Sequence, residues 1–134
     1  MFTLVIGKNS IEKMSFIATH IKTMYSKNTI FILDTTGELT NILNNEGLLV
    51  TNKIIEAEIV VSDGVNKAVK EKDLFEKEHV FCISNGDDLE KNFVEKAQRI
   101  VLFPVSNPEK MSKLLDIPVG YLQDLKPFEP ITVI

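Results

Sequence analysis

Short runs of apolar residues, separated by amphipathic stretches, constrain the fold of this sequence most strongly. Several runs are continuously apolar rather than alternating, which is typical of strands buried on both faces of a parallel sheet. Five clear runs and two weaker C-terminal ones occupy residues 3–6, 29–33, 57–61, 80–84, 100–105, 119–122 and 131–134. This pattern predicts a mostly parallel sheet of about five to seven strands.

The stretches between the runs have helical spacing. In the first, Met14, Ile17 and Ile21 recur at intervals of three and four residues, as on a helix that faces a core. Asn9, with Glu12 three residues later, has the pattern of a capping box at the start of that helix. Further helices are predicted over residues 36–43, over 87–98 and from 108, where Asn107 is the N-cap, to 115.

Alternating strands and helices predict one α/β domain over residues 1–134. We expect a three-layer, Rossmann-like and P-loop-like fold, with helices on both faces of the sheet. In such sheets a ligand normally lies beyond the carboxyl ends of the strands. Small polar residues follow several of the runs, among them Asp34, Asp63 and the Ser84-Asn85-Gly86 segment. The same residue types also serve as helix caps and turns, so both interpretations stay open at each position.

Composition excludes several classes of protein. The chain of 134 residues has a formal net charge of −4, so it lacks the basic character of a nucleic-acid binder. No segment approaches the roughly 20 apolar residues of a membrane span, and the apolar start is interrupted by Lys8, too early for a signal peptide. Cys82, the single cysteine, lies in an apolar run and fits a buried thiol in a reducing compartment. We therefore expect a cytoplasmic protein, and the abundance of Lys, Asn and Ile hints at a bacterial source.

The first forty residues resemble the ParA/MinD class of ATPases, which carry a deviant Walker A loop. That class has a strand, a loop of the form K-G-G-x-G-K-T-T, a long helix and a strand that ends in aspartate. Here residues 8–15 read K-N-S-I-E-K-M-S, and the next strand ends at Asp34, followed by T-T-G-E-L-T. Both lysines of the motif, Lys8 and Lys13, stand in their places. Residues 58–63, ending at Asp63, could stand where the class has its Walker B strand.

The departures from the motif decide what the resemblance implies. Glycines let successive backbone N–H groups curl around phosphates, whereas other residues rarely adopt the positive φ angles of such a nest. Asn9, Ser10 and Glu12 replace the three glycines, and Glu12 places a negative charge where the phosphates would lie. Met14 replaces the hydroxyl that would hold Mg²⁺, for which a thioether has no affinity. We therefore expect an ordinary capped helix start and no ATP hydrolysis.

The resemblance still implies candidate site residues. No cofactor is expected, but a residual contact with a nucleotide such as ATP, or with another anion, would involve Lys8, Lys13, Ser15, Asp34 and Asp63. Lys8, with the neighbouring Asn9 and Ser10, is also a candidate interface residue, as in the dimers of the class. The alternative without a function is that both lysines are solvated surface residues near the start of a helix. No metal site is expected, because the sequence has only two histidines and one cysteine, without ligand spacing.

These observations favour a non-catalytic, ATPase-like factor that binds another protein or itself, a homodimer included. One alternative is a protein that retains weak nucleotide binding. Another is a pseudo-receiver module, because residues 102–111 resemble the last strand and helix of response-regulator receivers, with Phe103 in place of their lysine. A receiver would have five strands in the order 2-1-3-4-5.

Overall fold

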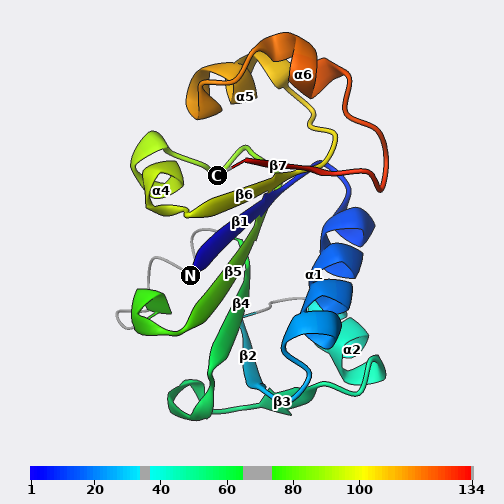
Figure 1. Ribbon diagram of the computed structural model, residues 1–134, viewed down its shortest axis with the longest axis vertical. Helices are drawn as coiled ribbons and strands as arrows, with labels where there is room; N and C mark the ends of the chain where they lie inside the picture. The colour runs from blue at the N-terminus through cyan, green and yellow to red at the C-terminus, as the bar shows by residue number, and fades with distance from the viewer. Residues whose placement is uncertain (34–36, 65–73, 134) are drawn as a thin grey trace.

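A seven-stranded sheet forms the centre of the molecule (Figure 1). The computed structural model describes residues 1–33, 37–64 and 74–133. The strand order is β3-β2-β4-β5-β1-β6-β7, in which β7 pairs antiparallel with β6 and all other neighbours pair in parallel. The strands are β1 (Phe2–Ile6), β2 (Thr29–Leu33), β3 (Leu49–Thr51), β4 (Ile59–Asp63), β5 (His79–Ser84), β6 (Arg99–Leu102) and β7 (Ile131–Val133). The predicted mostly parallel sheet of five to seven strands is confirmed.

Helices lie on both faces of this sheet, as the sequence predicts (Figure 1). The helices are α1 (Ser10–Met24), α2 (Glu38–Asn45), α4 (Lys91–Lys96), α5 (Pro108–Leu115) and α6 (Val119–Gln123), with short 3-10 turns η1 (Ile54–Glu56) and η2 (Leu74–Glu76). Helices α1 and α2 cover one face, and α4, α5 and α6 lie toward the other. The fold is therefore a three-layer α/β architecture.

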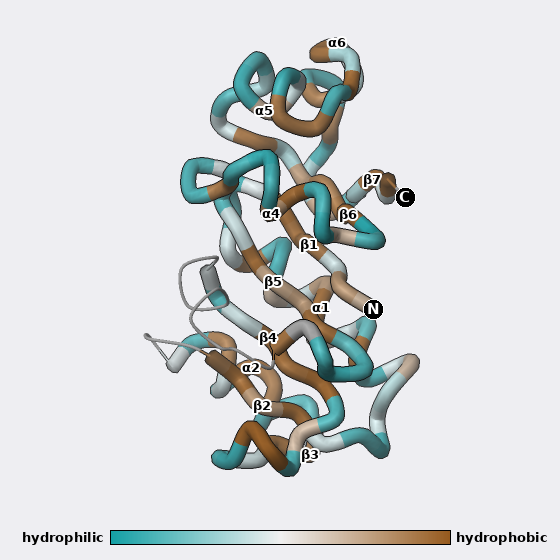
Figure 2. The backbone as a smooth tube through the Cα atoms, turned by 90° about the vertical axis from the view of Figure 1, so that its left-hand side faces the viewer, coloured by the Kyte–Doolittle hydropathy of each residue, from teal (hydrophilic) through white to brown (hydrophobic). Residues whose placement is uncertain are grey.

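Each face of the sheet has its own hydrophobic core, because successive side chains of a strand point to opposite faces. Leu4 and Ile6 of β1 belong to one cluster, together with Phe93 of α4. Val5 belongs to the other cluster, together with Ile17 of α1. Figure 2 shows that hydrophobic residues predominate along the central strands. Burial on both faces explains why these strands are continuously apolar in sequence.

The element predictions were right in type for most of the chain and wrong at a few positions. Residues 119–122, predicted as a strand, form helix α6 after Pro118, because a four-residue apolar run carries no period that separates the two. The predicted helix 87–98 begins only at Lys91, and residues 87–90 belong to a turn. Strand β3 was missed, since three residues are too few to form a pattern.

The strand order bears on the receiver alternative. A receiver would place its first strand between the second and the third. Here β1 lies between β5 and β6, and two strands separate it from β2. The order expected of a receiver is therefore not the order observed.

Candidate functional site

The sheet has a topological switch point between the adjacent parallel strands β1 and β5. After β1 the chain crosses through α1 to β2, on one side of the pair. After β5 it crosses through α4 to β6, on the other side of β1 and over the opposite face. Loops that diverge in this way leave a crevice beyond the carboxyl ends of the strands, where open α/β sheets bind ligands.

A polar crevice of about 410 Å³ lies at this place. Three segments form it: the β1–α1 connection with the first turn of α1, the end of β4 with Gly64, and the end of β5 with the turn that follows. The lining residues are Lys8, Ser10 and Lys13 from the first, Asp63 and Gly64 from the second, and Ile83, Ser84, Asn85, Asp87 and Asp88 from the third. The crevice thus holds two ammonium groups and three carboxyl groups.

The segment between β1 and α1 is a short turn into a capped helix. The Asn9 side-chain oxygen accepts hydrogen bonds from the backbone N–H groups of Ile11 (2.9 Å) and Glu12 (3.3 Å), which confirms Asn9 as the N-cap. The N–H of Gly7 donates to Ser84 O (3.0 Å), and that of Lys8 donates to Pro104 O (2.9 Å). Both N–H groups are therefore already hydrogen-bonded within the protein.

The backbone angles of this segment also differ from those of a phosphate nest. Among the described residues, none between 7 and 15 has a positive φ angle. Gly7 is required for another reason, because a Cβ added there would lie 2.8 Å from Phe103 Cβ. The one glycine of the segment therefore serves close packing against Phe103, just after β6, rather than an open loop.

Lys13 is buried under the crevice, with 4% of its surface exposed. Its Nζ donates a hydrogen bond to Ser84 O (3.2 Å), at the end of β5. Burial lowers the pKa of Lys13, and the carboxylates of Asp63, Asp88 and Glu12 oppose that shift. The lysine that stands at the phosphate-binding position of the motif is thus turned inward, against the end of β5.

The loop after β5 is organised by Ser84. Its hydroxyl donates to Asp88 Oδ1 (2.5 Å) and accepts from Gly86 N (2.9 Å), while Asp87 N donates to Asn85 Oδ1 (2.9 Å). The adjacent pair Asp87 and Asp88, which we expected at a helix start, therefore belongs to a turn that faces the crevice. This contribution of Asp88 was missed, although the Ser84-Asn85-Gly86 segment had indicated a turn.

Glu12 lies elsewhere than the sequence suggested. Its side chain is buried, with 3% of its surface exposed, and its Oε2 accepts a hydrogen bond from Phe128 N (3.2 Å). It lines a groove along α1 rather than the crevice. The expectation that Glu12 puts a charge in the phosphate position was therefore wrong, and the carboxyl groups that line the crevice are those of the three aspartates.

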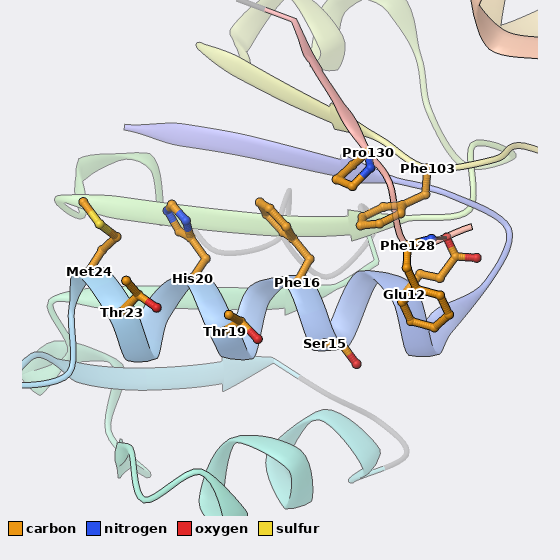
Figure 3. Close-up of a pocket in the computed structure, with 10 residues that line it drawn as sticks. All are labelled: Glu12, Ser15, Phe16, Thr19, His20, Thr23, Met24, Phe103, Phe128 and Pro130. Atoms are coloured by element: carbon orange, nitrogen blue, oxygen red, sulfur yellow. Dashed lines mark hydrogen bonds between the residues drawn. The ribbon is translucent and has the colours of Figure 1, made fainter. Parts of the chain in front are cut away.

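The structure brings together four of the predicted site residues, Lys8, Ser10, Lys13 and Asp63. Ser15 is exposed and lines the groove along α1, away from the others (Figure 3). Asp34 lies outside the described residues. The predicted role of each residue stays a prediction, although the shared crevice places the first four within reach of one ligand.

Neither a metal-binding cluster nor a membrane-spanning helix occurs in residues 1–33, 37–64 and 74–133. No group of three or more His, Cys, Asp or Glu side chains there could hold a metal ion. No helix in the same ranges has the length and apolar character needed to cross a membrane. Comparisons with protein-family models, with curated proteins and with solved structures found no match.

Proposed function

We propose that this protein is a non-catalytic, ATPase-like factor of the bacterial cytoplasm that acts by binding another protein or itself, in positioning or assembly. One observation carries the proposal. Where a P-loop ATPase would wrap phosphates, residues 7–15 form a capped helix start in which the N–H groups of Gly7, Lys8, Ile11 and Glu12 donate within the protein. The fold keeps the ligand-binding end of the sheet, and this segment gives no nest for a phosphate.

The carboxyl groups of the crevice also disfavour the binding of a triphosphate. A triphosphate placed against Lys13 would also lie near the carboxyl groups of Asp63 and Asp88. At about 4 Å and an effective dielectric constant of about 20, each such pair of like charges costs about 4 kcal/mol. Met14, at the position of the Mg²⁺ ligand, is buried in the core with 3% of its surface exposed. A triphosphate would therefore be repelled by these carboxylates, and Met14 offers Mg²⁺ no ligand.

Exposed apolar side chains support a role in binding other proteins. Ile11 and Tyr121 are each 65% exposed, and Phe128 is 60% exposed. Large apolar side chains that gather on a surface mark interaction sites. Ile11 and Phe128 both lie near the start of α1, since Phe128 bonds to Glu12 of its first turn. A true ATPase, or a cytoskeletal or secretion component, is the kind of partner that the resemblance implies.

Two measurements on the purified chain test this proposal. A coupled assay with Mg²⁺-ATP should give no turnover above background, and light scattering should give a mass above that of one chain. Lys13→Ala is the control, because it should leave the background rate unchanged. Mg²⁺-dependent turnover that disappears in Lys13→Ala would refute the non-catalytic assignment, and a strictly monomeric chain would refute self-association.

The shared crevice favours one alternative, a protein that retains nucleotide binding. Lys8, Lys13 and Asp63 line the same hollow at the switch point, as a residual site requires. Calorimetry with adenine and guanine nucleotides separates the two proposals. Heat that is lost in Lys13→Ala would support the alternative, and the absence of heat with every nucleotide would remove it.

A further inference from the structure

A groove of about 390 Å³ runs along α1, between the helix and the segment that leads into β7 (Figure 3). Phe16, His20 and Met24 are spaced four residues apart and therefore lie in one row on the helix. Phe128 and Pro130 line it from the segment before β7. The lining is mainly apolar and aromatic, and the volume falls within the range of small-molecule sites.

A cationic group lies directly behind one wall of this groove. Arg99, the first residue of β6, has its Nη2 atom 3.2 Å from His20 Nε2. Because a guanidinium only donates hydrogen bonds, His20 Nε2 accepts this one and the ring proton lies on Nδ1. Burial, followed by the charge of Arg99, lowers the pKa of His20, which agrees with a neutral ring.

The same guanidinium has an unused donor. Within the described part of the chain, Arg99 Nε is the one buried side-chain nitrogen or oxygen without a hydrogen-bond partner. Buried donors are nearly always paired, so an unpaired one calls for an explanation. Nε and Nη2 lie on the same edge of the guanidinium and form the fork that matches the two oxygens of a carboxylate. A single imidazole nitrogen can satisfy only half of that fork.

We propose that the groove along α1 binds a small amphipathic carboxylic acid. Its carboxylate accepts hydrogen bonds from Nε and Nη2 of Arg99, and its apolar chain lies along Phe16 toward Phe128. The His20 ring rotates aside and leaves its place to the carboxylate. This site is separate from the crevice at the switch point, so it holds whether or not that crevice binds a nucleotide.

The groove selects the charge and the length of this ligand. Glu12 lies at the far end, eight residues from His20, which is about 12 Å along a helix. A second acidic group on the ligand would meet the Glu12 carboxylate, so a monocarboxylate fits better than a diacid. An unbranched chain of medium length fills the distance between the two ends.

Decanoate, kept below its micellar concentration, is a suitable probe, with decanol as its uncharged match. Binding to the full chain is followed by calorimetry and by the amide signals of residues 16, 20 and 128. Arg99→Met removes the fork, Arg99→Lys keeps the charge without the fork, and Thr19→Trp fills the groove from an exposed position. Ile55→Ala, at a side chain that is 84% exposed outside the groove, is the control.

We expect decanoate to bind at least tenfold more tightly than decanol. Arg99→Met, Arg99→Lys and Thr19→Trp should each weaken the binding of decanoate at least tenfold, and Ile55→Ala should leave it unchanged. Equal binding of the acid and the alcohol would overturn the proposal, as would unchanged binding in Arg99→Met. Should Arg99→Met fail to fold, Thr19→Trp decides alone. Binding only of peptides that carry an acidic residue, and not of decanoate, would assign the groove to a protein partner and refute the small ligand.

Discussion

Replacement of Lys13 by methionine probes the most unusual feature of the crevice. The substitution keeps an unbranched apolar chain in a site that is 4% exposed, and removes the ammonium that bonds to Ser84 O. Ser84 O keeps the hydrogen bond from Gly7 N, so the substitution removes one hydrogen bond from a charged donor, which is worth about 1.5–3 kcal/mol. The lowered pKa of Lys13 shows that burial outweighs the attraction of the nearby carboxylates, so the loss of the charge returns part of that cost. We expect a net destabilisation of about 1 kcal/mol, well below the 3–5 kcal/mol for breaking a fully buried ion pair.

Urea denaturation at two pH values measures this effect. Since the pKa of Lys13 is lowered in the folded state, the unfolded chain holds more protons below the ordinary value of 10.5. The free energy of unfolding contributed by this group therefore rises as the pH rises toward 10.5. The wild type should gain stability over Lys13→Met between about pH 8 and about pH 10. Lys8→Met, at an exposed lysine of the same crevice, should change stability by less than about 0.5 kcal/mol at both values. A Lys13→Met protein that matches Lys8→Met at both pH values would refute the buried, bonded lysine.

Three further predictions test the packing around the two hollows. Gly7→Ala should destabilise the fold by about 1–3 kcal/mol in thermal or urea melts, because its Cβ would meet Phe103 Cβ at 2.8 Å; a neutral result would contradict the close contact. Burial raises the pKa of the Cys82 thiol, so a thiol reagent should label it only after unfolding, and rapid labelling of the native protein would disprove that burial. The pKa of His20 is lowered by burial and by Arg99, so the folded state holds fewer protons below about pH 6.5 and loses stability as the pH falls through that value. His20→Gln should flatten this decline between about pH 7 and about pH 5, and an unchanged slope would assign the decline to other groups.

Local chemistry made the start of α1 predictable from sequence. Asn9 is followed at a fixed spacing by helical residues, and the amide oxygen caps the helix as expected. Met14 and Ile17 repeat with the helical period and are buried, at 3% and 0% exposure. The Asn107-Pro108 start of α5 was equally readable, because Pro favours the first helical position and Asn the cap. Each of these signals involves residues within about one helical turn of each other.

Contacts between distant segments were beyond the reach of the sequence. Glu12 bonds to Phe128 N across 116 residues, and Lys13 to Ser84 O across 71. No local pattern records such pairings, so the side to which each residue of the loop turns could not be derived. Asp88 illustrates the same point, because an acidic pair before a helix fits an N-terminus as well as it fits a turn. The composition of the crevice therefore emerged only from the fold.

Lys13 Nζ and the N–H groups of Gly7, Lys8, Ile11 and Glu12 donate within the protein, from which we infer that residues 7–15 offer no binding site for a triphosphate. An NMR titration with Mg²⁺-ATP, observed at the backbone amides of residues 7–15 and of Ser84, tests this claim directly. We predict that these signals keep their positions at ATP concentrations in the millimolar range. Saturable shifts at these amides, together with a changed signal of the Lys13 side chain, would contradict it.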